Sequence, residues 1–301
     1  MAELGRLLTA MVTPFDRDLA VDYAQAGALA KALVASGSDG LVVTGTTGEN
    51  PALEPEENHR LWATVKEAVG DGAAVIAGSG TNGTGETIRL SRSAEKAGAD
   101  ALLLVVPYYN KPSQEGLYRH FKAVAESTSL PCILYNVPGR TIVSMSAETT
   151  LRLAHEVPNI VGIKEASGDF TQMARIVAGA PKGFNVWSGN DTDTFGLLCL
   201  GGYGVVSVTS HLIGKQIQRL ISLVREGDLD AAAAEHTRQL PLSQGLFVVS
   251  NPIPVKYALN KVGFRVGGLR LPLVEADAKT AAFLDDLLAG CTIDLPVGQR
   301  A

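Results

Sequence analysis

The sequence is poor in cysteine and contains no uninterrupted apolar run long enough to cross a membrane. Its three cysteines cannot all pair, and none has C-x-x-C spacing, which argues against a disulfide scaffold or a zinc ribbon. Residues 194–214 lack acidic side chains, lysine and arginine, but glycines at 201, 202 and 204 predict a short helix and a short strand instead of a span. The amino-terminal residues also lack a signal-peptide pattern, so we expect a cytoplasmic protein.

Charge is scarce as well. Charged residues make up 19 % of the chain, and the net charge is −5 at pH 7, with no basic stripe that would indicate a nucleic-acid partner. The five histidines are dispersed, without H-x-H or H-E-x-x-H, so no metal site is predicted. Asp191 and Asp193 could bind a divalent ion, but turn and capping roles are favoured. Hydrophobic residues, at 46 %, suffice for a large core.

The chain does contain a regular alternation of strand-like and helix-like segments. Short aliphatic runs begin about every 28 residues, the spacing of a strand–helix pair. Amphipathic segments such as 22–36, 86–97 and 116–128 lie between them and predict helices. The runs that predict strands are 7–15, 40–45, 73–80, 101–109, 132–138, 160–167, 184–191 and 204–211.

Eight such units in series predict an α/β fold, a closed (β/α)₈ barrel, with an open doubly wound sheet as the alternative. After residue 225 the pattern changes to helices without intervening strands, at 228–239, 254–262 and 275–288. We therefore expect a barrel over residues 1–225 and a small helical region over residues 226–301.

Lys164 is the most informative residue under this fold. It alternates with the apolar Ile163 and would point into the barrel, where a charged amine is costly unless it is paired or neutral. One interpretation is a structural ion pair at the rim of the barrel. The other is Schiff-base formation with a ketone, in which the iminium acts as an electron sink and the adjacent carbon becomes an enamine nucleophile.

Hydroxyl groups stand at the same expected edge of the barrel. Tyr135 lies in an inward phase of the neighbouring run, where a phenol can relay protons. Thr46 and Thr47 are bracketed by glycines, which let backbone amides converge on a small carboxylate. Taken singly, each has an ordinary structural explanation, but together with Lys164 they favour an amine-dependent aldolase over a metal-dependent one. A second amine, Lys256, falls in the helical region, where a structural role is favoured.

A glycine pattern leaves a different class of enzyme open. Residues 78–83 read G-S-G-T-N-G between a strand and a helix, which matches the fingerprint of nicotinamide oxidoreductases. However, the following strand ends without the acidic residue that would bind ribose, and the motif lies in the third unit instead of the first. These two points argue against the dehydrogenase.

Five motifs follow one another along the chain: GTTGE at 45–49, YYNKP at 108–112, YNVPGRT at 135–141, GIKE at 162–165 and NPIPVK at 251–256. Together they resemble the motifs of the 4-hydroxy-tetrahydrodipicolinate synthase (dihydrodipicolinate synthase) family. This resemblance covers nearly the whole chain and implies a TIM barrel with a C-terminal helical region. It also implies a lyase that condenses pyruvate with L-aspartate 4-semialdehyde in lysine and diaminopimelate biosynthesis. Such an enzyme needs no cofactor beyond its Schiff base with pyruvate and is usually a homotetramer, a dimer of dimers.

The resemblance also implies roles for matching residues. Lys164 would form the Schiff base, and Tyr135 would donate and accept protons. Thr46, Tyr135 and Tyr109 would form a proton relay, with Tyr109 reaching across a tight dimer interface into the neighbour's site.

The implied substrate contacts come from three further residues. Thr47 and the backbone of Val206 would hold pyruvate, and Arg140 would meet the carboxylate of the semialdehyde. Sister aldolases that act on sugar acids, such as N-acetylneuraminate lyase, share the lysine and the phenol. Tyr109 and Arg140 favour the dipicolinate branch, but a sister aldolase or a ligand-sensing barrel without turnover stays open.

Many family members are inhibited by lysine through a cleft at the dimer interface. Asn82, Glu86 and Tyr108 match that cleft. The histidines of feedback-sensitive bacterial enzymes are replaced by Pro55 and Asn58, and residues 50–51 also depart from their pattern. The sequence therefore does not predict whether lysine inhibits.

Overall fold

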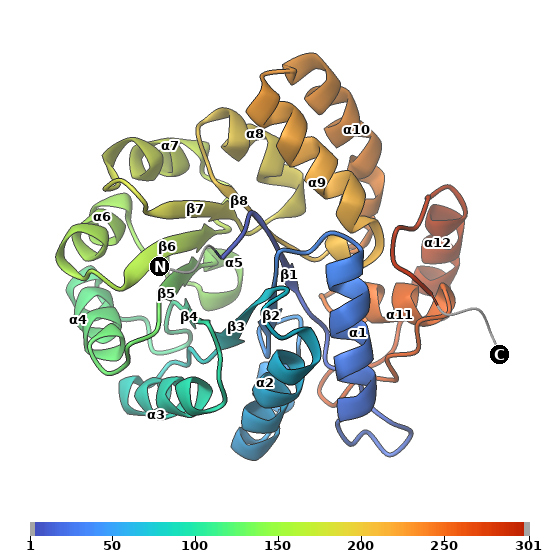
Figure 1. The fold of residues 1–301 in the computed structure, drawn as a ribbon, viewed down its shortest axis with the longest axis horizontal. Helices are drawn as coiled ribbons and strands as arrows, with labels where there is room; N and C mark the ends of the chain where they lie inside the picture. The colour runs from blue at the N-terminus through green and yellow to red at the C-terminus, as the bar shows by residue number, and fades with distance from the viewer. Residues whose placement is uncertain (1–3, 298–301) are drawn as a thin grey trace.

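The computed structural model describes residues 4–297, and all eight predicted strands are present in it. They form a closed parallel barrel in chain order, with β8 paired to β1 (Figure 1). This closure excludes the open doubly wound sheet. Each strand ends before its apolar run does, because the last residues of the run leave the sheet to form the loops at the carboxyl edge. The strands are β1 Leu7–Ala10, β2 Gly40–Val43, β3 Ala74–Gly78, β4 Ala101–Val105, β5 Cys132–Asn136, β6 Ile160–Glu165, β7 Asn185–Ser188 and β8 Gly204–Ser207.

Helices alternate with these strands and cover the outside of the barrel (Figure 1). The predicted segments 22–36, 86–97 and 116–128 correspond to α1, α3 and α4, so these predictions are confirmed. The elements are α1 Tyr23–Ala35, η1 Asn50–Ala52, α2 Pro55–Val69, α3 Thr84–Lys96, α4 Gln114–Ala125, α5 Pro138–Thr141, α6 Ala147–Glu156, α7 Phe170–Gly179, η2 Asp191–Asp193, α8 Thr194–Cys199 and α9 Ser210–Glu226.

Three further helices form the C-terminal region that the sequence predicts: α10 Leu229–Gly245, α11 Ile253–Lys261 and α12 Ala278–Ala289. Helix α10 packs on α9, and α11 packs on α12, beside α1 in Figure 1. The division at residue 225 stays a prediction, and residues 298–301 lie outside the described part of the chain. Segment 194–214 contains α8, β8 and the start of α9, and within residues 4–297 no helix is long and apolar enough to cross a membrane.

The barrel interior is filled beneath the carboxyl edge by Trp187. This side chain is fully buried on β7, and its Nε1 donates to the carbonyl of Gly5 at 3.1 Å. Gly162 on the adjacent strand makes room for it, since a Cβ there would lie 2.5 Å from Cζ3 of Trp187. Trp187 is paired with Lys164 in the sheet register. The packed interior therefore forms a floor just below the level of Lys164.

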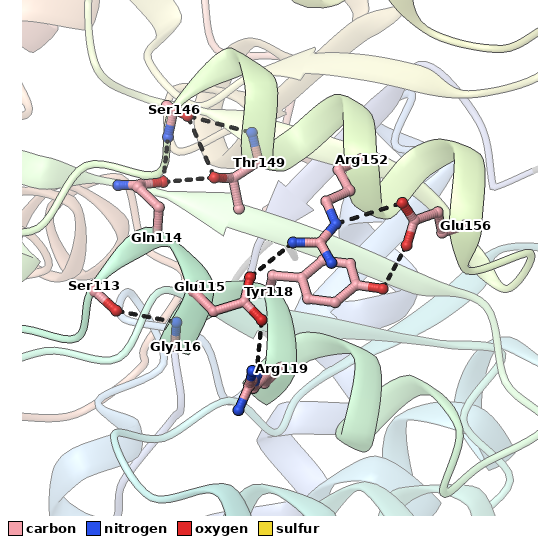
Figure 2. Close-up of polar contacts among 10 residues, drawn as sticks. All are labelled: Ser113, Gln114, Glu115, Gly116, Tyr118, Arg119, Ser146, Thr149, Arg152 and Glu156. Carbon is pink, nitrogen blue, oxygen red and sulfur yellow. Dashed lines mark hydrogen bonds and ion pairs between the residues drawn. The ribbon is translucent and has the colours of Figure 1, made fainter.

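A polar network joins α4 to α6 on the outside of the barrel (Figure 2). Glu115 accepts from both Arg119 and Arg152 at 2.7 Å, and the Arg152 guanidinium lies 3.5 Å from the centroid of the Tyr118 ring. The Tyr118 hydroxyl donates to Glu156 at 2.5 Å. Because these charges are solvated, we expect them to orient the two helices more than to stabilise the fold.

His211, at the start of α9, is held as one neutral tautomer. Its Nε2 accepts from the amide of Val12 at 3.1 Å, so the ring proton lies on Nδ1, which donates to the carbonyl of Val208 at 2.8 Å. The ring is fully buried, and this burial lowers the pKa of His211 to about 4.

We therefore expect the fold to lose stability as the pH falls from 6.5 towards 4, since His211 takes up a proton more readily in the unfolded chain. The loss from this one histidine between pH 7 and pH 5 is about 2 kcal/mol. Urea unfolding of the wild type and of His211→Asn at both pH values would measure it. The His211 variant should lose less stability than the wild type between these two pH values. A control variant, in which the exposed His59 is replaced by glutamine, should lose as much stability as the wild type. An equal loss in the His211 variant would contradict the assignment.

Candidate functional site

A cavity of about 270 Å³ opens at the carboxyl edge of the barrel. Loops after β2, β4, β7 and β8 line it, together with the ends of β5 and β6 and residues 247 and 251 from the C-terminal region. Much of the wall is apolar. Among the described residues that line it, Lys164 and Arg140 are the charged side chains, and both are cations. The cavity therefore suits a small anionic ligand.

Lys164 points into this cavity, as its strand phase predicts. It lies on β6 opposite Tyr135 of β5 in the sheet register, and its Nζ lies 4.1 Å from the centroid of the Tyr135 ring. Both side chains are 6 % exposed. Within residues 4–297, Lys164 has no ion-pair partner and no hydrogen-bond partner for Nζ, so the interpretation as a structural ion pair at the rim is not supported.

The hydroxyl groups beside Lys164 are also available to a ligand. Thr46 and Tyr135 both line the cavity, and in the described part of the chain neither side-chain oxygen has a hydrogen-bond partner. Thr47 differs, because its Oγ1 accepts from Nδ2 of Asn251 at 2.9 Å. An amine, a phenol and a hydroxyl without protein partners thus converge on one small space, as general acid–base chemistry requires.

The strands that carry Tyr135 and Lys164 are joined by the residues that follow them. Nδ2 of Asn136 donates to both carboxylate oxygens of Glu165 at 3.1 Å, and the amide of Ser167 and Nε2 of Gln172 also donate to Glu165. Glu165 is fully buried, and burial raises the pKa of its carboxyl group. This cluster lies on the outer face of the sheet and fixes the ends of β5 and β6 relative to each other.

The glycine pattern at 78–83 is explained by close packing between strands. A Cβ on Gly78 would lie 2.4 Å from the carbonyl oxygen of Thr44, and one on Gly80 would lie 2.4 Å from the amide nitrogen of Val105. Both glycines line the cavity. The lack of a side chain at these two positions therefore lets neighbouring backbone segments come close together at the wall of the site. This packing explains the two glycines without a bound pyrophosphate.

Lys256 has a structural role, as the sequence indicates. Its Nζ lies 2.7 Å from Oε1 of Glu49 and donates to the carbonyl of Gly268 at 2.6 Å, with both charged side chains 1 % exposed. Burial lowers the pKa of Lys256, and the nearby Glu49 carboxylate opposes that shift. Oε2 of Glu49 also accepts from the amide of Arg270. The ion pair thus anchors the loop that carries Thr46 to the C-terminal region.

Asp191 and Asp193 lie in the η2 turn that follows β7, but the capping role is not found: Asp193 is the N-cap residue of α8 without a side-chain capping hydrogen bond. Asp191 accepts from the Ser207 hydroxyl at 2.5 Å and from the amides of Val208 and Thr209. Asp193 accepts from Nδ2 of Asn190 at 2.8 Å. Between residues 4 and 297 no three histidine, cysteine or acidic side chains converge in a way that could hold a metal ion.

Of the remaining predicted site residues, one lines the cavity and two do not. Arg140, on the short helix α5, lines the cavity, and its Nη2 lies 3.5 Å from the carbonyl oxygen of Asn251. Tyr109 is 87 % exposed, with a positive φ of 75°, and does not line the cavity. Val206 is buried in β8, and Val208, just after the end of this strand, lines the cavity instead. The structure therefore brings together Lys164, Tyr135, Thr46, Thr47 and Arg140, while the roles predicted for Tyr109 and Val206 stay predictions.

The three residues matched to an effector cleft lie in the segments that follow β3 and β4. Tyr108 lines the cavity. Glu86 is paired with Arg89 at 2.6 Å, and the carbonyl of Asn82 accepts from Nδ2 of Asn110 at 2.7 Å. Nothing in these contacts tests the prediction of a lysine-binding cleft.

Sequence reasoning missed Asn251 as a residue of the site. It is buried, lines the cavity and contacts both Thr47 and Arg140. Its partner Thr47 lies about two hundred residues earlier in the chain, so no local spacing connects them. The signal that could have found it is the family motif at 251–256, which begins with this asparagine.

Comparison with known proteins agrees with the geometry. The model of the dihydrodipicolinate synthetase family matches residues 3–289. A 4-hydroxy-tetrahydrodipicolinate synthase from Dehalococcoides mccartyi is 61 % identical over 297 residues, which cover 99 % of this chain and 100 % of the relative.

Solved structures are similar over the same length. Dihydrodipicolinate synthase from Bacillus anthracis superposes with a TM-score of 0.95 at 43 % identity and covers 97 % of this chain and 100 % of its own. The enzyme from Cyanidioschyzon merolae, solved with lysine bound, has a TM-score of 0.94 at 46 % identity and covers 95 % and 98 % of the two chains. The chain therefore belongs to the dihydrodipicolinate synthetase family.

Proposed function

We propose that this protein is a 4-hydroxy-tetrahydrodipicolinate synthase, a lyase that condenses pyruvate with L-aspartate 4-semialdehyde. The observation that carries the proposal is the position of Lys164. This buried amine has no protein partner in the described chain and lies 4.1 Å from the Tyr135 ring in a cavity lined by threonines and an arginine. Full-length relatives that bear this name support the choice of reaction.

The first half of the reaction joins pyruvate to the enzyme. Once the amine of Lys164 has given up its proton, it attacks the keto carbon of pyruvate, and the carbinolamine loses water to give an iminium. The methyl group then loses a proton, and the electron pair moves into the iminium to form an enamine. In this proposal Tyr135 and Thr46, which both line the cavity, carry these protons, and Thr47, which lines it as well, donates to the pyruvate carboxylate.

The second half builds the new ring. The enamine carbon attacks the aldehyde carbon of the semialdehyde, and a proton from Tyr135 neutralises the resulting alkoxide. The amino group of the semialdehyde can then attack the iminium carbon and displace Lys164, which restores the free enzyme. One water is released in total. Because the iminium itself accepts electrons, this route needs no metal or organic cofactor.

Arg140 would hold the carboxylate of the second substrate at the mouth of the cavity. Its guanidinium can bind a carboxylate through two parallel hydrogen bonds. Val206 would contribute a backbone contact to pyruvate. The reaction belongs to lysine and diaminopimelate biosynthesis, for which a cytoplasmic location stays the prediction.

The proposal includes a homotetramer built from tight dimers, in which Tyr109 completes the neighbour's proton relay. Its exposure and left-handed backbone support this, because an exposed aromatic side chain in a strained conformation is typical of functional positions. Mixed dimers of Lys164→Ala and Tyr109→Phe chains would test it. One of the two sites in each mixed dimer would then have both residues, so mixing two weakly active proteins should restore activity. No gain on mixing would contradict a shared relay.

Steady-state turnover of pyruvate with L-aspartate 4-semialdehyde, compared with turnover of pyruvate with aldoses, tests the reaction. We expect turnover with the semialdehyde, and the same assay with added L-lysine would show whether lysine inhibits. Preferential use of aldoses would favour a sister aldolase, and ligand binding without product would favour a sensing barrel. Either result would contradict the proposed function.

A further inference from the structure

Glu165 is a buried acid that the proposed reaction does not use. Its side chain is fully buried, and within residues 4–297 no lysine or arginine forms an ion pair with it. It accepts instead from Nδ2 of Asn136, the amide of Ser167 and Nε2 of Gln172, at 2.8 to 3.1 Å. Burying a carboxylate is costly even when it is hydrogen-bonded, so stability alone does not explain this residue.

The strand that carries Glu165 contains a shift of register, a β-bulge at Val161. Residues 132 and 133 of β5 are opposite residues 160 and 162 of β6, so Val161 has no partner in β5. From there on, Lys164 is opposite Tyr135. The same strands paired without the bulge would place Lys164 opposite Asn136, on the outer face of the sheet. A single unpaired residue therefore decides whether the amine points into the cavity.

Burial alone does not fix this register. Ile133 and Leu134 point to opposite faces of β5, and both are fully buried. Ile163 of β6 is fully buried as well. Apolar residues on both faces give a pair of strands little preference between two registers that differ by one residue. The choice therefore depends on polar contacts that only one register allows.

The hydrogen bonds between Asn136 and Glu165 are contacts of this kind. Nδ2 of Asn136 lies 3.1 Å from both carboxylate oxygens of Glu165, and the two residues are opposite each other in the sheet. A shift by one residue would separate them and leave a buried amide and a buried acid without each other, which is costly. The pair directly follows Tyr135 and Lys164, so it holds the register where these two side chains enter the cavity.

Asn136 also holds the segment that carries Arg140. Its Oδ1 accepts from the amide of Met145 at 2.9 Å. Residues 137–144 lie between these two positions and include the short helix α5 with Arg140. The same side chain thus joins the two ends of this segment and contacts the acid on the neighbouring strand.

We propose that Glu165 and Asn136 are positioning residues, whose hydrogen-bonded pair holds β5 and β6 in the bulged register and thereby keeps the amine of Lys164 in the cavity beside Tyr135. Neither residue of the pair lines the cavity, so both act on the reaction through the residues that they hold. This inference rests on the proposed function, because it concerns the lysine that the proposed reaction uses.

The rate of Schiff-base formation reports the position of Lys164 most directly. Enzyme is mixed with pyruvate, and borohydride is added after increasing times. Mass spectrometry then gives the fraction of protein that carries an adduct. Repetition at several pyruvate concentrations separates the maximal rate from the concentration at half-saturation. Thermal unfolding of each variant is measured alongside, so that a loss of stability is recorded separately.

Asn136→Asp removes the donor and places two carboxyl groups opposite each other. We expect the maximal rate to fall about 10- to 100-fold, the scale of a small displacement of a reacting group, while the half-saturating concentration of pyruvate changes less than about threefold. Exchange of the two groups, Asn136→Asp with Glu165→Gln, restores a donor and an acceptor in reversed order, and the Met145 amide keeps an acceptor. This double variant should recover the maximal rate to within about threefold of the wild type, because the two substitutions compensate each other.

A milder variant keeps the test independent of whether Asn136→Asp folds. Gln172 is half-buried near the start of α7, and Gln172→Leu removes one donor to Glu165. We expect this variant to fold and its maximal rate to fall about three- to tenfold, since the carboxylate loses part of its orientation.

Asp39 provides the matched control for a carboxylate with a purely structural role. It accepts from two backbone amides and from a glutamine, as chemically similar donors do for Glu165, but at the amino-terminal end of β1. Asp39→Asn should lower the unfolding temperature and leave the rate of Schiff-base formation unchanged.

An unchanged rate in Gln172→Leu, or in folded Asn136→Asp, would overturn the inference. It would also be overturned by a double variant more than about tenfold slower than the wild type, or by equal slowing in Asp39→Asn and Gln172→Leu. Wild-type protein that forms no adduct would overturn the inference and the proposed function together. An adduct without turnover of the semialdehyde would overturn the proposed function alone.

Discussion

Replacing Lys164 by alanine is expected to lower turnover of pyruvate with L-aspartate 4-semialdehyde on the order of 10⁴-fold or more, the scale of losing a covalent nucleophile. No other amine can take its place, because the remaining buried lysine described near the site, Lys256, is held in an ion pair with Glu49. Steady-state kinetics of purified protein would measure the loss.

The same substitution is expected to leave the fold intact. Removing a paired buried lysine leaves its carboxylate partner uncompensated, which is strongly destabilising. Lys164 has no such partner in residues 4–297, so thermal unfolding should move little. Lys164→Arg is a matched control that keeps the positive charge but stays protonated, and it should be as inactive as the alanine variant. If either variant kept more than about a tenth of the wild-type activity, Lys164 would not be the nucleophile, because loss of a covalent nucleophile lowers activity far more than that.

Replacing Tyr135 by phenylalanine is expected to lower kcat about 10²- to 10⁴-fold, the range for one general acid–base group. The phenyl ring keeps the packing against Lys164, whose Nζ lies 4.1 Å from the ring centroid. The change therefore removes the proton carrier while leaving the shape of the site. Schiff-base formation and alkoxide protonation both need this proton. The substitution should therefore affect the conversion of pyruvate much more than its noncovalent binding.

Tyr118 supplies the control for the Tyr135 substitution. Unlike the hydroxyl of Tyr135, its hydroxyl is hydrogen-bonded within the protein, to Glu156 at 2.5 Å, and it belongs to the network between α4 and α6 on the outer surface (Figure 2). Tyr118→Phe should leave kcat close to the wild-type value. A similar loss in both variants would mean that Tyr135 acts through the fold and not through its hydroxyl group.

The strands and their order could be predicted because the physics that fixes them is local. A parallel strand buried on both faces needs a continuous apolar run, and each run is visible in the sequence. The alternation of phase along the strand also predicts the direction of Lys164, because neighbouring side chains point to opposite faces. Once the barrel is inferred, its carboxyl edge brings Thr46 and Tyr135 to the same place.

The supporting contacts could not be predicted because their partners are distant in the sequence. Asn251 meets Thr47, and Lys256 meets Glu49, only after the C-terminal region has packed against the barrel. The cluster of Glu165 with Asn136 depends on the register between two strands, which the apolar pattern leaves free to shift. The exposed position of Tyr109 likewise depends on a loop conformation with positive φ at a residue other than glycine.

Reductive trapping bears most directly on whether this enzyme works through one lysine. Protein incubated with pyruvate and borohydride should acquire a stable adduct on the proteolytic peptide that contains Lys164, and Lys164→Ala should acquire none. Unmodified wild-type protein, or an adduct confined to the peptide that contains Lys256, would contradict the account.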